Sequence, residues 1–129
     1  MQRIGFTNGC YDLFHRGHIF FLSKCYNYCD YLIVAVNSDE SVRHLKGEGR
    51  PVNSLHKRLL DLNNYASAVI PFDGNVSKLV SIINPDIVIL GYDQYWAEAA
   101  PHRTFTTIGK LEGFSTTLQI KAQQDKTAI

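Results

Sequence analysis

Two histidines three residues apart, His15 and His18, are the residues in this chain best placed to do chemistry. Gly17 lies between them, an apolar segment precedes them, and a helical pattern begins near residue 19. A strand that passes through a glycine-containing turn into a helix directs backbone N–H groups and the positive helix end at one point, which favours an anion. Imidazoles there can donate to phosphate oxygens as negative charge develops. The segment therefore predicts a phosphate site.

A histidine pair of this kind has two simpler interpretations, namely ordinary surface histidines or part of a metal site. The preceding strand, the glycine and the following helix together favour phosphate binding. Cys25 and Cys29 lie four residues apart in the expected helix over residues 19–29 and could in principle add metal ligands. They share a helix face with Ile19 and Leu22, so we expect them to be buried as small apolar residues.

The composition is that of a soluble globular protein. A chain of 129 residues has room for one core, so we expect a single domain over residues 1–129. The formal charge of +1 gives no general reason to expect nucleic-acid or membrane binding. No apolar run is long enough to span a bilayer, and the start lacks a signal-peptide pattern. Three cysteines suit a reducing compartment, so we expect a cytoplasmic protein.

Strand and helix patterns alternate along the chain. Continuous apolar runs predict strands over residues 4–7, 31–36, 68–70, 87–90 and 105–108. Helical spacing and capping residues predict helices over residues 19–29, 39–42, 54–63, 76–83 and from residue 116 onwards. This alternation indicates an α/β fold of the Rossmann-like, three-layer type, with a mostly parallel sheet and helices on both faces.

Parallel sheets of this kind bind ligands beyond the carboxyl ends of their strands, where the winding direction changes. The candidate functional segments, residues 9–18, 37–39 and 91–93, each follow a different predicted strand. We therefore expect them to form one site.

A second anion-binding pattern lies near the end of the chain, where Gly113 precedes three hydroxyl residues, Ser115, Thr116 and Thr117. Thr116 and Gln119 fit a capping box, so a plain capped helix is the alternative. One cap needs one hydroxyl, which leaves spare donors for a ligand placed before the helix.

The glycine-rich loop over residues 46–53 carries Lys46 and Arg50. These side chains are either solvated or form a clamp over a triphosphate, in which Lys46 neutralises charge and Arg50 binds oxygens through two N–H groups. The two predicted anion sites favour the clamp. Arg58, inside the following helix, is a weaker candidate because helix arginines are usually exposed.

Together these segments resemble the nucleotidyltransferases that carry an HxGH signature, here residues 15–18, over nearly the whole chain from residue 5 to about 124. Residues 7–18, 35–39 and 46–52 look like the adenylyltransferase domain of bacterial ADP-heptose synthases, and residues 112–117 also occur in glycerol-3-phosphate cytidylyltransferases.

Some features depart from the heptose enzymes. The segment between Asp93 and Gly113 is closer in length to the glycerol-phosphate enzymes, which carry an arginine where this chain has Lys110. Residues 91–94 are similar to archaeal FAD synthetases.

The resemblance implies an in-line displacement in which an acceptor phosphate oxygen attacks the α-phosphorus of a nucleoside triphosphate and pyrophosphate leaves. It implies catalytic roles for His15, His18 and Lys46, with Mg²⁺ held through the triphosphate and not directly by the protein. Asp93 is a candidate for ribose or base contacts or for the water shell of the metal. The implied nucleotide contacts are Thr7, Asn8, Gly9, Gly17, Gly91, Asp93, Ser115, Thr116 and Thr117. The implied contacts to substrate phosphate are Arg50, Arg58 and Lys110.

The expected reaction joins ATP to an acceptor like heptose 1-phosphate and yields an ADP-sugar. Two alternatives remain: a CTP-dependent enzyme acting on glycerol 3-phosphate or a similar polyol phosphate, and a non-catalytic nucleotide-binding module. Members of the family are often dimers, and seven tyrosines and seven phenylalanines leave apolar surface for a partner. We therefore expect a homodimer, with no nucleic-acid or membrane partner.

Overall fold

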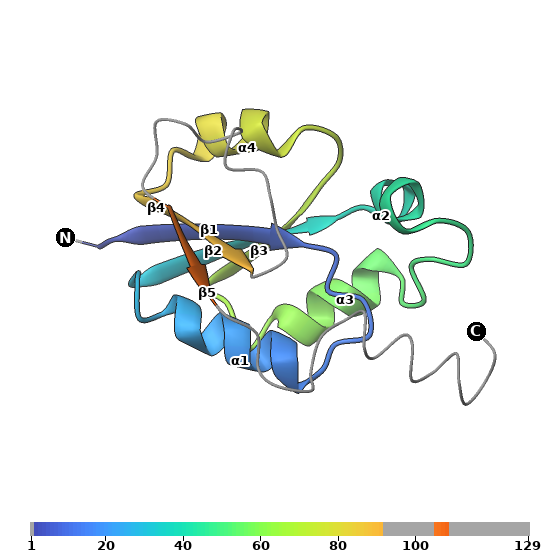
Figure 1. The fold of residues 1–129 in the computed structure, drawn as a ribbon, viewed down its shortest axis with the longest axis horizontal. Coiled ribbons are helices and arrows are strands. Elements are labelled where there is room, and N and C mark those ends of the chain that lie inside the picture. Colours follow the sequence, from blue (N-terminus) through green and yellow to red (C-terminus); the bar gives the residue numbers. More distant parts are fainter. Residues whose placement is uncertain (1, 92–104, 109–129) are drawn as a thin grey trace.

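The computed structural model describes residues 2–91 and 105–108, in which strands and helices alternate (Figure 1). The strands are β1 (Ile4–Gly9), β2 (Tyr31–Asn37), β3 (Ala68–Phe72), β4 (Ile87–Gly91) and β5 (Phe105–Ile108). The helices are α1 (Arg16–Cys25), α2 (Asp39–Lys46), α3 (Leu55–Leu62) and α4 (Val76–Ile83). The predicted order of these elements is confirmed, and the predicted final helix lies outside the described residues.

The strands form one five-stranded sheet in the order β3-β2-β1-β4-β5. Every strand pair in it is parallel, so the predicted α/β fold is confirmed. The chain leaves β1 toward β2 and β3 and later returns to β4 on the other side of β1. The winding therefore changes direction at β1, and a ligand crevice is expected beyond its carboxyl end.

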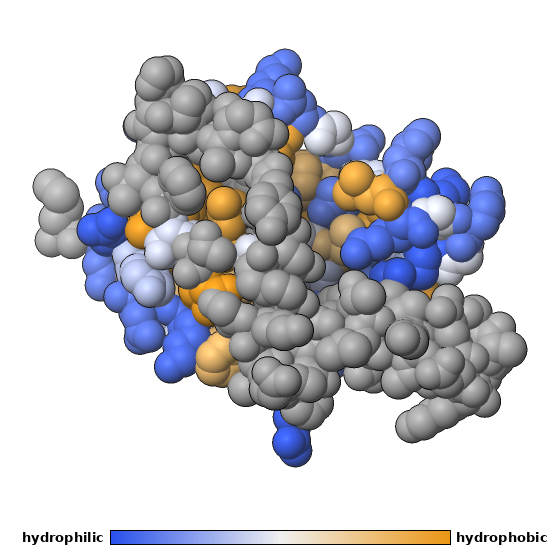
Figure 2. Space-filling view, viewed as in Figure 1, coloured by the Kyte–Doolittle hydropathy of each residue, from blue (hydrophilic) through white to orange (hydrophobic). Residues whose placement is uncertain are grey.

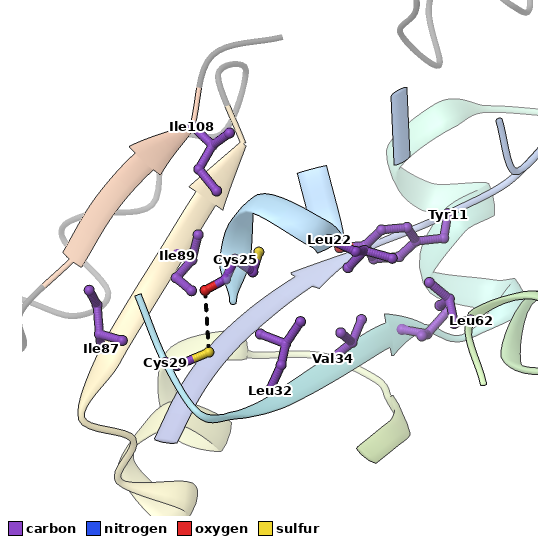
Figure 3. Close-up of a cluster of buried hydrophobic side chains, with 11 residues drawn as sticks. Tyr11, Leu22, Cys25, Cys29, Leu32, Val34, Leu62, Ile87, Ile89 and Ile108 are labelled. Carbon is purple, nitrogen blue, oxygen red and sulfur yellow. Dashed lines mark hydrogen bonds between the residues drawn. The ribbon is translucent and has the colours of Figure 1, made fainter. Parts of the chain in front are cut away.

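Helices cover both faces of the sheet, with α1 and α3 on one face and α4 on the other (Figure 1). Leu22 of α1 and Leu62 of α3 belong to one core cluster with strand residues such as Val34 (Figure 3). Val80 of α4 packs with Phe6 and other strand residues on the opposite face. Burial on both faces explains why the strands are continuous apolar runs.

Helix α1 differs from its predicted bounds at both ends, since it begins at Arg16 and ends at Cys25. Cys29 therefore lies in the segment before β2, although both thiols are buried as expected. The Sγ atom of Cys29 donates to the carbonyl oxygen of Cys25 at 3.4 Å (Figure 3). A Cβ atom on Gly5 would come within 2.6 Å of the Cys29 Sγ atom, so this strand position requires glycine. Burial raises the pKa of both thiols.

Among the helices of the described part of the chain, none is both long and apolar enough to cross a membrane.

Candidate phosphate-binding site

The two signature histidines form the cap of helix α1. His15 is the N-cap residue in an extended conformation, and its Nδ1 atom accepts a hydrogen bond from the N–H of Gly17 at 3.0 Å. His18 is the third helical residue, and its Nδ1 atom accepts from the N–H of His15 at 3.1 Å. This is a capping box made by two imidazoles in place of the usual hydroxyl and carboxylate side chains. The three-residue spacing of the histidines matches that of a capping box, but histidine is not among the usual cap residues.

The cap bonds assign the protons of both rings. A neutral imidazole whose Nδ1 accepts a hydrogen bond must carry its proton on Nε2. Burial lowers the pKa of His15, and burial together with the neighbouring His15 lowers the pKa of His18 to about 3. Both rings are therefore neutral near pH 7. The Nε2 atom of His15 is buried and finds no hydrogen-bond partner among the described residues. Such a donor fits an anionic ligand.

Aromatic rings surround His18. Its ring centroid lies 3.9 Å from that of His15, and the ring of Phe14 stacks on it at 5.4 Å with 12° between the planes. The ring of Tyr11 lies 5.4 Å away in a tilted arrangement, and Tyr65 contacts Phe14 from the other side. These rings exclude water from His18, which is the physical cause of its low pKa.

Asp12, in the segment between β1 and α1, is fully buried and was not predicted as a site residue. Its carboxylate accepts from the N–H groups of Val52 and Asn53 at 2.7 and 2.8 Å and from Nε of Arg50 at 2.9 Å. Burial alone would raise the pKa of Asp12, but the two N–H groups and the Arg50 guanidinium outweigh it and hold this pKa below its ordinary value. Asp12 therefore ties the loop after α2 to the end of β1.

The loop predicted as a clamp has two parts with different surroundings. Helix α2 extends four residues beyond its predicted end, so Lys46 is its last residue and not part of the loop. Gly47 and Gly49, which follow it, adopt φ values of 94° and 83°. Residues 46–49 are exposed, whereas the Arg50 side chain is only 10% exposed. Over α2 the surface is largely hydrophilic (Figure 2).

The charged groups of this loop lie near the histidines and the end of β1. The charge of Lys46 acts on both Cys10 and His18, and that of Arg50 acts on Cys10. The Nη2 atom of Arg50 is buried without a hydrogen-bond partner in the described part of the chain. The structure therefore brings His15, His18, Lys46 and Arg50 together at one edge of the sheet.

Arg58 differs from the prediction, which placed it on the helix surface as a contact for substrate phosphate. Its side chain is fully buried. Its N–H groups donate to the backbone oxygens of Cys10, Asn37 and Asn53 and to the carboxylate of Asp39, at 2.7 to 3.1 Å. These donors are occupied by the protein itself, so we assign Arg58 to the framework of the site and not to phosphate binding.

The remaining predicted residues of the described chain lie at the carboxyl ends of neighbouring strands. Thr7, Asn8 and Gly9 end β1, and Gly91 ends β4, which pairs with β1. Thr7 is buried, and its Oγ1 atom has no hydrogen-bond partner within residues 2–91 and 105–108. The N–H of Gly17 is taken by His15. Outside the described residues lie Asp93, Lys110, Ser115, Thr116 and Thr117.

The described residues contain no group of three or more His, Cys, Asp and Glu side chains arranged to hold a metal ion. Asp12 and Asp39 are both paired with arginines.

The family model described as cytidylyltransferase-like matches residues 6–128 of this chain. The chain belongs to the cytidylyltransferase-like family. This membership places it in the nucleotidyltransferase class of enzymes, as the HxGH resemblance predicted.

Several relatives in this family are bacterial proteins named bifunctional protein HldE. The protein from Alkalilimnicola ehrlichii is 38% identical over 95% of this chain, and that from Campylobacter jejuni is 39% identical over 97%. This chain spans 28% of the length of each of these two relatives.

Solved structures of other proteins share the fold. The lipopolysaccharide core biosynthesis protein from Thermoplasma volcanium is 26% identical, with a TM-score of 0.77 over 87% of this chain and all of that one. A pantoate-β-alanine ligase from Francisella tularensis is 16% identical and shares the fold alone, with a TM-score of 0.63 over 99% of this chain and 71% of that one.

Proposed function

We propose that this domain transfers AMP from ATP to a sugar 1-phosphate similar to heptose 1-phosphate and releases pyrophosphate. The observation that carries the proposal is the histidine cap of α1. It presents two neutral imidazoles with protons on Nε2 at the positive end of a helix, and the Nε2 atom of His15 is buried without a described partner.

The reaction needs no nucleophile from the protein. A phosphate oxygen of the acceptor forms a bond to the α-phosphorus of ATP, the bond from that phosphorus to the bridging oxygen breaks, and pyrophosphate leaves. Negative charge grows on the oxygens around the α- and β-phosphates. His15 and His18 donate through Nε2 to these oxygens, and a donor that is fixed in advance stabilises the transition state without reorganising.

Lys46 and Arg50 offset the charge of the phosphates during the reaction. Two phosphates repel one another, and both cationic side chains offset that repulsion as the acceptor approaches. Lys46 is exposed at the end of α2, next to glycines with positive φ values, so it can approach a bound substrate. Arg50 offers a planar fork that suits phosphate oxygens.

Mg²⁺ belongs to the proposal as a companion of the triphosphate, where it would offset phosphate charge. The residue set at the site fits this arrangement, because Asp12 and Asp39 are already bound to arginines and His15 Nε2 and Arg50 Nη2 are donors that can bind phosphate oxygens. Further nucleotide contacts would come from Thr7, Asn8, Gly9, Gly91, Asp93, Ser115, Thr116 and Thr117. Lys110 would contact substrate phosphate.

The choice of ATP and a sugar phosphate rests on the resemblance of residues 35–39 and 46–52 to the heptose enzymes and on the relatives named HldE. A homodimer is also part of the proposal, supported by the family resemblance. Light scattering on the purified protein would test it, and a monomer at all concentrations would contradict it.

A pyrophosphate-release assay tests the function. Each of ATP, CTP, GTP and UTP is combined with Mg²⁺ and with either a heptose 1-phosphate, a hexose 1-phosphate or glycerol 3-phosphate. We expect release with ATP and a sugar 1-phosphate, at least tenfold faster than with CTP, because a site built for one base edge leaves buried groups unpaired with another.

Three results would contradict the proposal. A preference for CTP and glycerol 3-phosphate would assign the chain to the glycerol-phosphate branch. Tight nucleotide binding without release with any acceptor would indicate a non-catalytic module. Equal rates with His15→Ala would show that release comes from a contaminating enzyme.

A further inference from the structure

Two arginines near the carboxyl ends of β1 and β2, the buried Arg58 and the largely buried Arg50, differ in how their side-chain N–H groups are used. Arg58 donates four hydrogen bonds to oxygens of the protein. Among the described residues, the side chain of Arg50 donates only through Nε, to Asp12. Its terminal Nη2 atom is buried and finds no acceptor in that part of the chain. Every side-chain nitrogen of Arg58 therefore has an acceptor within the protein, whereas the Nη2 atom of Arg50 has none among the described residues.

A buried guanidinium N–H without an acceptor carries a desolvation cost, so a fold tolerates it where a ligand supplies the acceptor. The surroundings of Arg50 specify an anion. The neighbouring cation Lys46 and the Nε2 atom of His15 also lack an anionic protein partner within the described residues. A phosphate group brings several oxygens and negative charge to such a site.

Asp12 has no capacity left for a ligand of its own. One carboxylate oxygen accepts from the N–H groups of Leu13 and Asn53, and the other accepts from Val52 N–H and Arg50 Nε. These four donors fill the acceptor positions of a carboxylate. Asp12 is therefore neither a free base nor an open metal ligand, and its effect must pass through the groups that it holds.

We propose that Asp12 is a positioning residue that holds Arg50 by Nε and so directs the terminal nitrogens of Arg50 at a substrate phosphate group. The side-on bond uses the Nε edge of the guanidinium and leaves Nη2 for the ligand. The bonds to Val52 and Asn53 fix the backbone on the carboxyl side of Arg50, which prevents the side chain from swinging away. This inference rests on the proposed function for the identity of the phosphate, which belongs either to the acceptor or to the nucleotide.

The test compares Asp12→Asn, Arg50→Gln and the double variant with the wild type. We measure the KM of the sugar 1-phosphate, the KM of ATP, kcat, and the Tm of each protein. Asp61→Asn serves as the matched control, because Asp61 forms an ion pair with Lys57 on α3 and has no contact with the site.

We expect Arg50→Gln to raise one of the two KM values by about 10- to 100-fold, the range for losing a hydrogen bond to a charged group. Asp12→Asn should raise the same KM value, since the amide keeps the shape but loses the charge and one acceptor. If Asp12 acts through Arg50, the double variant should be no more than about twofold worse than Arg50→Gln in that KM value. A change in the KM of the sugar phosphate identifies the acceptor, and a change in the KM of ATP identifies the nucleotide.

Two results would overturn the inference. In the first, Asp12→Asn lowers Tm but leaves both KM values and kcat within twofold of the wild type, which indicates a structural role only. In the second, the effects of the two single variants multiply in the double variant, which indicates independent actions.

Calorimetric titration with ATP and Mg²⁺, and separately with inorganic pyrophosphate and with the sugar 1-phosphate, separates this inference from the proposed function. If the wild type binds these ligands without turnover, the proposed function fails, and the same comparison is made on Kd. Weaker binding by both variants then supports the role of Asp12, and unchanged Kd values overturn it. If the wild type binds none of these ligands, the inference is overturned as well.

Discussion

The ring of His18 stacks on the ring of His15 with their centroids 3.9 Å apart, and a backbone N–H fixes the Nδ1 atom of each ring. The same two side chains therefore cap helix α1 through Nδ1, and in the proposed function they bind phosphate through Nε2. The proposal thus assigns stability to the Nδ1 side of the rings and catalysis to the Nε2 side. Variants that keep one side and lose the other can separate the two roles.

His18→Ala removes both roles, and we expect kcat to fall by about 10²- to 10³-fold, with a smaller change in nucleotide affinity. The lost cap should also lower the free energy of unfolding by about 0.5–2 kcal/mol. His18→Gln is the matched variant, because glutamine at this helical position can still accept the hydrogen bond from the His15 N–H. It should keep near-normal stability and still lose activity. Steady-state kinetics and urea unfolding measure both quantities, and normal turnover by His18→Ala would exclude the catalytic role.

The stability of the protein should decrease with acidity below about pH 6.5. Folded His18 stays neutral down to about pH 3, whereas the unfolded chain takes up a proton below about pH 6.5. The unfolded state then binds more protons, so the free energy of unfolding falls by up to about 1.4 kcal/mol per pH unit for this group. His15 acts in the same direction, and Asp12, with a lowered pKa, loses its stabilising effect only below about pH 4.

Urea unfolding at pH 7.5, 6.5, 5.5 and 4.5 measures this slope. His18→Gln should flatten it between pH 6.5 and 4.5, because glutamine does not titrate. An identical slope in the variant would mean that other groups cause the acid dependence.

Phe14→Ala should raise the pKa of His18. The Phe14 ring stacks on His18 and keeps water away from it, so its removal lowers the cost of charging the imidazole. An NMR titration of the histidine ring nitrogens follows each residue separately, and the exposed His56 on α3 serves as the internal control. An unchanged His18 titration would show that the Phe14 ring does not cause the low pKa.

Hydrogen exchange should divide the loop after α2 into two parts. The N–H groups of Val52 and Asn53 donate to buried Asp12, so they should be protected without any ligand. Residues 46–49 are exposed and should gain protection only when nucleotide and acceptor bind, if the loop closes over them. Amide exchange by NMR, with and without ligands, gives both results. Unchanged exchange over residues 46–49 would count against a clamp.

Arg58→Met should lower the free energy of unfolding by about 3–5 kcal/mol, because it leaves Asp39 and three backbone oxygens without their donor. The exposed Arg43 on α2 provides the control, and Arg43→Met should stay within about 0.5 kcal/mol of the wild type. Urea unfolding measures both. A small effect of Arg58→Met would show that the surrounding oxygens find other donors.

Local patterns along the chain were sufficient to predict the order of strands and helices. Strands buried on both faces need continuous apolar runs, as residues 31–36 and 87–90 have, and these runs are visible without a structure. The start of α1 was placed three residues too late, since a cap formed by His15 and His18 has no common precedent among capping residues. The error concerns the cap, and the helix itself was correctly expected.

The sequence by itself determined the fold class, the family and the segments that meet at the carboxyl edge of the sheet, because these depend on short-range patterns. Only the tertiary structure decided the partners of Asp12 and Arg58. Asp12 meets Arg50 across 38 positions of sequence, and Arg58 meets Cys10 across 48. The partners of a buried charge are the groups that the packed elements place beside it, and the spacing of residues along the chain does not show which groups those are. For this reason Arg58, whose nitrogens all bind protein oxygens, and Arg50, whose Nη2 atom finds no described acceptor, differ in role although they lie eight residues apart.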